Sequence, residues 1–152
     1  MEQQNKFEYY ERSEEDQKIF YERCLRKYNE KNKGKHYRNK IYNALELLDP
    51  REGDVILDAG CGIGAITIEC LMKGAIVKSI DYSVDAIRSF KFLMDHKDIT
   101  NYEVQQASIT DIPFEDNYFD KIVCPDVIEH LHEQDTNKSI NEFYRILKKG
   151  GQ

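Results

Sequence analysis

A glycine-rich loop that follows an apolar run and a carboxylate is the segment best suited to chemistry. Residues 55–64 read VILDAGCGIG, in which the apolar run ends at Asp58 and glycine then occupies alternate positions. Glycine leaves no side chain above the loop, so a ligand can approach the main chain closely. The amides that open the next helix carry partial positive charge and favour a carboxylate or phosphate. The pattern predicts a nucleotide-type cofactor site at Asp58, Gly60, Gly62 and Gly64.

A second acidic residue, Asp81, ends another apolar run and is followed by Tyr82. A carboxylate at this position can accept hydrogen bonds from both hydroxyls of a ribose, as in dinucleotide-binding folds. Tyr82 then offers an apolar edge to an adenine base. The alternative is that Asp81 only caps the next helix, although Ser83 is the better cap.

Two further side chains are candidates for covalent or proton-transfer chemistry. Cys61 lies inside the glycine loop, but no base is near it in the sequence, which favours a small lining residue over a nucleophile. His130 follows the fourth apolar run, and an imidazole group is suited to taking a proton from a hydroxyl group near neutral pH. The alternative is that Glu129 and His130 only order the start of a helix or the loop beside the cofactor.

Strand and helix patterns alternate from residue 55 onward, and these elements must position the candidate residues. Strands are predicted at 55–58, 75–81, 102–107 and 119–124. Helices are predicted at 65–72, after Ser83 and near the end of the chain. The apolar positions of the last two helices are Ile87, Phe90, Leu93 and Met94, and Ile140, Phe143, Ile146 and Leu147. The alternation predicts a parallel sheet with right-handed crossovers.

Two more helices are predicted before this alternation. The first begins near Ser13 and continues to about Tyr28, and residues 31–35 form a linker. The second begins after the linker and stops at Asp49-Pro50; its apolar face contains Tyr37, Ile41, Ala44, Leu45 and Leu48. We therefore divide the chain into an N-terminal helical lid with its linker, residues 1–35, and a core, residues 36–152.

The composition of the 152 residues is that of one globular domain with a heavily charged surface, with 33% charged residues and a formal net charge of -6. A net negative charge argues against a large nucleic-acid interface, which needs clustered Lys and Arg. The four cysteines show no CxxC spacing, so reduced thiols and a cytoplasmic location are expected. The polar N-terminus is not a signal peptide, and no apolar run is long enough for a membrane span.

Several motifs then occur in a fixed order along the chain. They are DAGCGIG (58–64), IDYS (80–83), DIPF (111–114), Phe119-Asp120, VIEHL (127–131) and RILKKGG (145–151). Together they resemble a class I, Rossmann-like S-adenosylmethionine-dependent methyltransferase of the small-molecule and quinone-biosynthesis type, over about residues 37–151. The glycine loop alone would be a weak signal, whereas the ordered set is strong.

This resemblance implies an α/β fold with a doubly wound parallel sheet and the cofactor S-adenosyl-L-methionine, with S-adenosyl-L-homocysteine as product. The loop from Gly60 to Gly64, including Cys61, would hold the methionyl end of the cofactor, and Asp58 would face its ammonium group. Asp81 would hold the ribose. The adenine would lie beside Tyr82, Ser108 and Ile109; Ser108 stands where the family often has Asp. Tyr37 and Arg38 reach the cofactor carboxylate in one interpretation and form a solvated helix start in the other.

The resemblance also implies seven strands, of which the sequence contains four. We expect a chain truncated before its fifth strand, which leaves residues 119–124 as an unpaired edge. Self-association through that edge or reduced stability would follow, together with a lack of methyl transfer by the fragment itself.

The methyl acceptor is expected to be an unidentified small molecule, and three other functions remain as alternatives. A nicotinamide-dependent dehydrogenase needs its third glycine one place later than Gly64. A non-catalytic cofactor-binding or assembly module is the second. The third is a metal-assisted RNA 2'-O-methyltransferase fragment, because Asp126, Glu129 and His130 resemble the metal-binding pattern of small-RNA 2'-O-methyltransferases, with Asp126 where those carry Glu. We assign no metal site.

Overall fold

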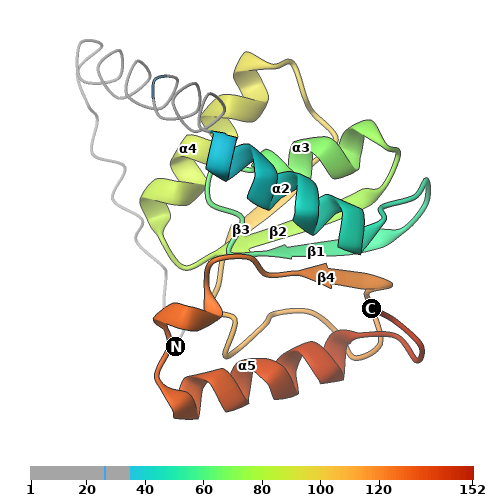
Figure 1. Ribbon diagram of the computed structural model, residues 1–152, viewed down its shortest axis with the longest axis vertical. Coiled ribbons are helices and arrows are strands. Elements are labelled where there is room, and N and C mark those ends of the chain that lie inside the picture. The colour runs from blue at the N-terminus through green and yellow to red at the C-terminus, as the bar shows by residue number, and fades with distance from the viewer. Residues whose placement is uncertain (1–25, 27–34) are drawn as a thin grey trace, which may run out of the picture.

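A parallel sheet of four strands forms the centre of the molecule (Figure 1). The computed structural model describes Arg26 and residues 35–152, and the helix and linker predicted before residue 35 lie outside the described residues. The strands are β1 (Val55–Ala59), β2 (Ile76–Asp81), β3 (Glu103–Gln106) and β4 (Lys121–Val123). They are all parallel and have the order β3-β2-β1-β4. The predicted α/β class and parallel sheet are confirmed.

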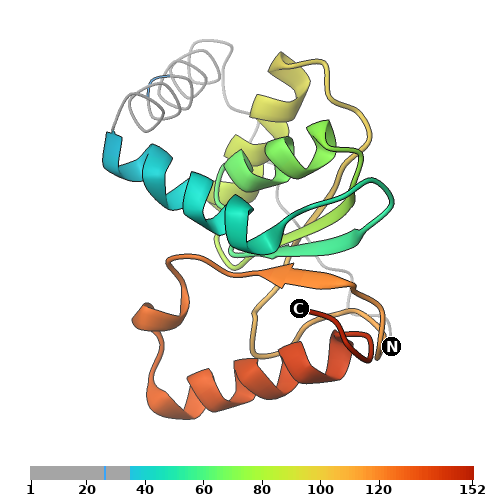
Figure 2. The same ribbon diagram turned by 45° about the vertical axis from the view of Figure 1, so that its right-hand side comes forward.

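Helices cover both faces of this sheet, so the fold is doubly wound (Figures 1 and 2). One face carries α2 (Lys35–Leu48), α3 (Ala65–Met72) and α4 (Val84–His96). The other face carries α5 (Glu133–Ile146), which follows a short 3₁₀ helix, η1 (Ile128–His130).

The core explains why the first three residues of β1, 55–57, are all apolar. Ile56 packs with Leu45 of α2 and Cys70 of α3 on one face. Leu57 packs with Phe119 and Ile146 on the other face. A strand that is covered on both faces has no position for a solvated side chain, so successive residues are apolar.

The helices begin and end largely where the sequence predicts. α3 spans 65–72 as predicted, and the Ser83 hydroxyl caps α4 by accepting a hydrogen bond from the Ala86 amide (3.3 Å). The apolar residues predicted on α4 are all buried. On α5 the prediction is wrong in part, because Ile140 is 52% exposed, Ser139 is buried instead, and Leu147 follows the helix.

β4 is three residues long instead of the six predicted, and Asp120 provides the reason. The Asp120 amide donates to the Val55 carbonyl (2.8 Å), and its carboxylate accepts from the Val55 amide (2.9 Å). A side chain thus replaces a main-chain partner at the start of the strand. Phe119 pairs instead with Leu147 in an isolated parallel bridge.

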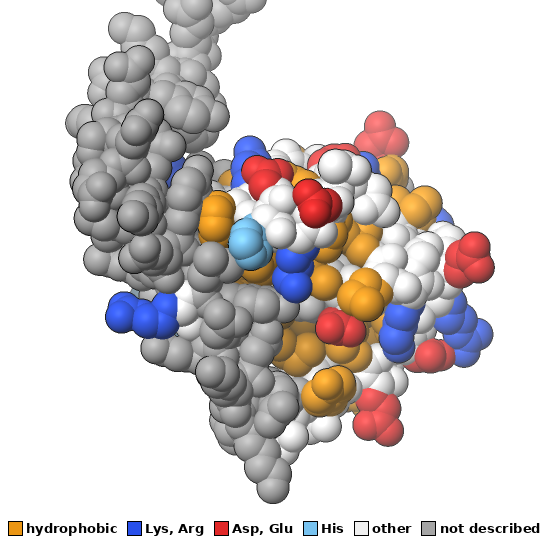
Figure 3. All heavy atoms as spheres, turned by 90° about the horizontal axis from the view of Figure 1, so that it is seen from above, with side chains coloured by type: hydrophobic (Ala, Val, Ile, Leu, Met, Phe, Trp, Pro, Cys, Tyr) orange, Lys and Arg blue, Asp and Glu red, His pale blue; other side chains and the backbone are white. Residues whose placement is uncertain are grey.

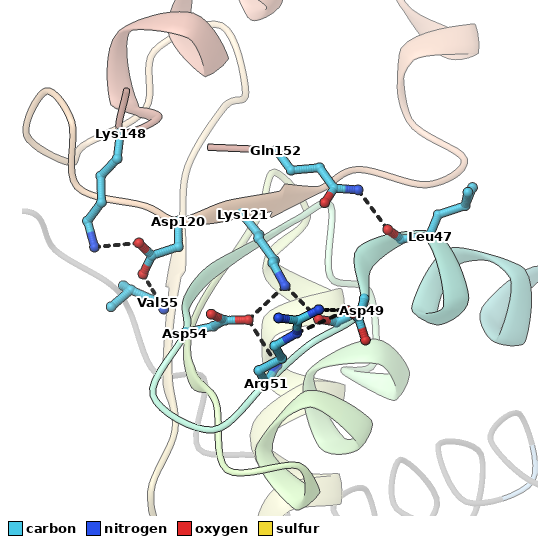
Figure 4. Close-up of polar contacts among 9 residues, drawn as sticks. All are labelled: Leu47, Asp49, Arg51, Asp54, Val55, Asp120, Lys121, Lys148 and Gln152. Carbon is cyan, nitrogen blue, oxygen red and sulfur yellow. Dashed lines mark hydrogen bonds and ion pairs between the residues drawn. The ribbon is translucent and has the colours of Figure 1, made fainter. Parts of the chain in front are cut away.

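The edge formed by β4 is not wholly unpaired, in contrast to the prediction (Figure 4). The Gln152 amide donates to the Asp120 carbonyl (3.0 Å), and the Ile122 amide donates to the Gln152 carbonyl (2.9 Å). The Gln152 side chain also donates to the Leu47 carbonyl at the end of α2 (2.7 Å). Gln152 therefore lies alongside β4 as a further parallel strand would.

Arg145 of α5 fixes the loop that follows β3. Its guanidinium donates to the carbonyls of Ile112 (2.9 Å) and Phe114 (2.8 Å) and pairs with Asp116. The Glu142 carboxylate accepts from Arg145 and from the Ile112 amide (2.7 Å). One charged cluster thus ties residues 112–116 to α5.

The described surface mixes charges of both signs. On the face drawn in Figure 3, acidic and basic side chains are interspersed around apolar ones. None of the helices in the described part of the chain is both long and apolar enough to cross a membrane.

The glycine loop allows a prediction on stability. Gly64 has φ +86°, and a Cβ atom there would lie 2.6 Å from side-chain atoms of Phe90 and Met94. Gly64→Ala should therefore lower the free energy of unfolding by about 2–4 kcal/mol, from left-handed backbone strain and overpacking. Gly62→Ala is the control, since Gly62 has φ +54° but open space around it, and about 1 kcal/mol is expected. Urea unfolding measures both, and equal losses would contradict the packing argument.

Candidate functional site

Two adjoining cavities lie at the carboxyl ends of the strands. The first has a volume of about 210 Å³ and the second about 500 Å³. Gly60 and Asp126 line both cavities, so the two meet at these residues. The first is otherwise lined by Lys40, Ile41, Asp58, Cys61, Gly62, Ile63, Ala65, Ile66 and Pro125. The second is otherwise lined by Asp81, Tyr82, Ala107, Ser108, Ile109, Thr110, Val127, Leu131 and Asp135.

The glycine loop is held against β2 by its own main chain. The amides of Gly60 and Cys61 both donate to the Ile80 carbonyl (2.8 and 3.0 Å). A Cβ atom on Gly60 would lie 2.2 Å from a methyl group of Val127, so only glycine fits there. Gly64 lines neither cavity and instead packs over α4, so the structure does not bring it to the others.

Asp81 connects the loop to the start of α4. One carboxylate oxygen accepts from the Gly62 amide (2.9 Å), and the other accepts from the Ser83 amide (2.8 Å). The carboxylate therefore contacts the helix start, as the capping alternative proposed, but it also reaches the loop and the second cavity. Tyr82, beside it, is 77% exposed and lines the same cavity.

Asp58 is a carboxylate in the interior, with 1% of its surface exposed. Burial raises the pKa of Asp58 to about 6 from its ordinary 3.8, and the nearby charge of Asp81 acts in the same direction. Two hydrogen bonds from Thr67 to one oxygen, from its amide (3.1 Å) and its hydroxyl (2.7 Å), oppose this rise. Asp58 thus contributes a charge that titrates close to the physiological range.

Cys61 is a lining residue whose thiol stays protonated. Burial, and then the charges of Asp58 and Asp81, raise the pKa of Cys61 far above its ordinary value. A nucleophilic cysteine needs the opposite shift. The structure therefore agrees with the interpretation of Cys61 as a small residue in the loop.

Ser108 and Ile109 lie together on the wall of the second cavity. The Ser108 hydroxyl shares a hydrogen bond with the Thr110 hydroxyl (2.7 Å) and accepts from the Thr110 amide (3.1 Å). Ile109 is buried, with 7% exposed. The predicted adenine-contacting residues are therefore neighbours of Asp81 and Tyr82 around one cavity.

Lys40 is a site residue that sequence reasoning missed. Its ammonium forms an ion pair with Asp126 (2.7 Å), which links α2 to the loop after β4 at the junction of the cavities. This contact raises the pKa of Lys40. No sequence signal marks the pair, because 86 residues separate its members. The side chains of Tyr37 and Arg38 lie outside the described residues.

His130 lies away from the cavities. It ends η1, is exposed and lines neither cavity. Glu129 and His132 are also exposed, and they line neither cavity. Among the residues that the structure describes, no three His, Cys, Asp or Glu side chains form a group suited to a metal ion.

The comparisons with known proteins decide the family. The family described as methyltransferase domain matches residues 56–151. The chain belongs to this methyltransferase domain family. The resemblance to class I S-adenosylmethionine-dependent methyltransferases is thereby confirmed, and the other functions considered receive no support.

Several relatives of this methyltransferase domain are known. Phosphoethanolamine N-methyltransferase 3 of Arabidopsis thaliana is 35% identical over 112 residues, which cover 70% of this chain and 21% of that protein. The solved PH0226 protein of Pyrococcus horikoshii OT3 has a TM-score of 0.69 at 28% identity, covering 78% of this chain and 57% of that one. A Haemonchus contortus phosphoethanolamine N-methyltransferase 2, solved with S-adenosyl-L-methionine, has a TM-score of 0.64 at 28% identity, covering 74% and 26%. The methyltransferase domain spans 21% to 59% of the length of the curated relatives it matches.

Asp58 makes the stability of the methyltransferase domain depend on pH in a defined direction. The folded protein holds a proton on Asp58 up to about pH 6, whereas the unfolded chain releases it near pH 3.8. The folded state therefore binds more protons in this window, and the free energy of unfolding loses about 3 kcal/mol from Asp58 as the pH rises through it.

Asp58→Asn removes this titration while its side-chain oxygen still accepts from Thr67. Relative to the parent, the variant should gain stability as the pH rises from about 4 to 6 and keep that gain above pH 6. Urea unfolding at a series of pH values measures the difference. A difference that does not vary with pH would contradict the buried titration.

Proposed function

We propose that the chain binds S-adenosyl-L-methionine across the two cavities, as the cofactor-binding domain of an enzyme that transfers the methyl group to a small-molecule acceptor. The observation that carries this proposal is the junction of the cavities at Gly60 and Asp126. The smaller, more polar cavity suits the methionyl end of the cofactor, and the larger suits the adenosine. The sulfonium, which joins these two parts, would then lie beside the junction.

Two opposite charges support the methionyl subsite. Asp58 presents a carboxylate to the first cavity, which suits the ammonium group of the cofactor. Lys40 is the cationic residue among those that line this cavity, and its ammonium group suits the carboxylate at the methionyl end of the cofactor. The amides at the start of α3 add partial positive charge at the same end.

The adenosine subsite is supported by Asp81 and its neighbours. The Asp81 carboxylate can accept hydrogen bonds from the ribose hydroxyls while the Gly62 amide fixes its position. Tyr82, Ser108 and Ile109 provide the apolar and polar edges expected around an adenine.

The reaction needs little from the protein beyond alignment. The acceptor attacks the methyl carbon, the carbon–sulfur bond breaks, and S-adenosyl-L-homocysteine leaves as a neutral thioether. A protic acceptor also loses one proton, and His130 stays the candidate for taking it. Its exposed place on η1 equally supports the alternative in which it orders the segment after β4.

A small-molecule acceptor and a cytoplasmic location agree with the remaining observations. On the face drawn in Figure 3, the interspersed charges do not form the basic tract that nucleic acid requires. The cysteines of the described segment, Cys61, Cys70 and Cys124, are free thiols. Free buried thiols are typical of a reducing compartment.

Calorimetry with S-adenosyl-L-homocysteine tests this function. The parent should bind it, and NAD should give no signal. Asp81→Ala should weaken binding by about 1–3 kcal/mol, because buried polar groups lose their partner. Asp85→Ala is the matched control, since Asp85 is an exposed acid on the same segment and lines neither cavity. Binding of NAD alone, or unchanged affinity in Asp81→Ala, would contradict the assignment.

We also propose self-association through the edge at β4. An apolar groove there is lined by Leu47 and Leu48 of α2 and by Ile122, Cys124 and Pro125, and Leu47 is 74% exposed. Exposed strand edges invite pairing with another chain. The sedimentation coefficient should rise with protein concentration, and Leu47→Glu should suppress this rise. A protein that stays monomeric at every concentration tested would contradict the proposed self-association.

A further inference from the structure

A chain of three buried polar side chains lies beneath the first cavity. Asp58 lies near the end of β1, Thr67 lies on α3 and Ser79 lies on β2, and all three are at most 1% exposed. The Thr67 hydroxyl donates to Asp58 Oδ2 (2.7 Å) and lies 2.8 Å from the Ser79 hydroxyl. Buried hydroxyl groups in an otherwise apolar layer need a reason, because burying a polar group costs free energy unless it is hydrogen-bonded.

The direction of the hydrogen bonds in this chain is determined. Thr67 has a single hydroxyl proton, and it is donated to Asp58. The Ser79 hydroxyl must therefore donate to the Thr67 oxygen. The Thr67 amide donates to the same Asp58 oxygen (3.1 Å). Two donors thus converge on Oδ2, and a proton on that oxygen would clash with both of them.

The other oxygen of Asp58 is left for a ligand. Within the described residues no hydrogen bond to Oδ1 is found, yet no fully buried side-chain oxygen lacks a partner. Oδ1 must therefore reach the surface of the cavity that Asp58 lines. Any proton that Asp58 binds also goes to Oδ1, since Oδ2 already accepts two.

We propose that Thr67 and Ser79 are positioning residues that turn Oδ1 of Asp58 toward the first cavity, where the ammonium group of the cofactor and a proton compete for it. This inference rests on the proposed function for the identity of the ligand. It assigns a role to two side chains that touch neither the cofactor nor the acceptor. It also couples cofactor affinity to pH.

The other charged and titratable groups around Asp58 do not obscure this coupling. Cys61, Cys70 and Cys124 face Asp58 from the glycine loop, α3 and the end of β4, and burial keeps their thiols protonated, with the pKa of Cys70 and of Cys124 raised to about 12. Asp81 contributes a negative charge from the end of β2. Lys40 and Asp126, at the mouth of the cavity, pair with each other.

The expected pH profile is specific. The dissociation constant for S-adenosyl-L-homocysteine should be level above pH 7 and rise about tenfold for each pH unit well below 6, since binding then displaces a proton from Asp58. Asp58→Asn should bind weakly at every pH and lose this dependence.

Thr67→Val tests the positioning role. It removes the hydroxyl donor but keeps the amide, so the midpoint of the profile should move upward by about one pH unit, the scale of one hydrogen bond to a charged group. Thr67→Ser should restore the parent profile. Ser79→Ala, which keeps the Thr67 hydroxyl, should move the midpoint in the same direction by less, and it carries the test should Thr67→Val fail to fold. Ser139→Ala is the control for loss of a buried hydroxyl elsewhere, with no shift expected.

A measurement without ligand tests the positioning role of Thr67 separately from the proposed binding of the cofactor. Carbon-13 NMR of the Asp58 carboxyl should show the same upward shift in Thr67→Val. No binding of S-adenosyl-L-homocysteine by the parent would overturn the proposed function and the ammonium contact with it. A Thr67→Val protein that binds with the parent's pH profile and an unshifted carboxyl signal would overturn the positioning role alone.

Discussion

Strand β1 is paired along both edges and covered on both faces, and the rest of the structure depends on this. Pairing with β2 and β4 satisfies its main chain, and the helices on either side bury its side chains. A strand in this position carries whatever stands at its end into the interior. Asp58 stands next to that end, so the fold places a carboxylate in the interior, with its free oxygen at the wall of the first cavity. The glycine loop begins directly after it, which brings the buried charge and the exposed amides to one point.

The buried carboxylate of the candidate site therefore lowers the stability of the fold. An ionised carboxylate in the core is unfavourable unless polar groups surround it, and Thr67 supplies them from the first turn of α3. Other acidic residues of the domain behave in the opposite way. Asp120 and Glu142 pair with Lys148 and Arg145, which lowers the pKa of both carboxylates, and these pairs hold the loops and α5 in place. The charge pairs of Asp120 and Glu142, which stabilise the domain, thus lie apart from the buried carboxylate of Asp58.

Much of the fold could be predicted from the sequence because its signals are local. The glycine loop, the Ser83 cap and the apolar face of α4 are each read from a few adjacent residues. The failures depend on contacts across the chain. β4 is short because the Asp120 side chain binds Val55, and no pattern in 119–124 indicates that contact.

The residues of the candidate site also divide into those that local signals predict and those that depend on contacts across the chain. Asp58, Gly60, Cys61, Gly62 and Asp81 were found because they belong to one strand–helix–strand unit, and the structure brings them together. Lys40 comes from a helix far away in sequence and was missed. Thr67 carried a signal that was not used, a polar side chain between the apolar residues Ile66 and Ile68 of α3. His130 follows β4 as Asp81 ends β2, which made it a candidate, but η1 carries it to the surface.

The Lys40–Asp126 pair has a consequence for how a ligand enters. Both side chains are about half exposed, at 48% and 49%, and they form the contact between α2 and the loop after β4 at the mouth of the cavity. Dissolved ions screen such a contact, whereas they barely affect the hydrogen bonds beneath it. The ionic strength of the medium therefore affects the ion pair at the mouth of the cavity but not the buried hydrogen bonds. Salt should accordingly alter the rates at which a ligand enters and leaves more than its affinity.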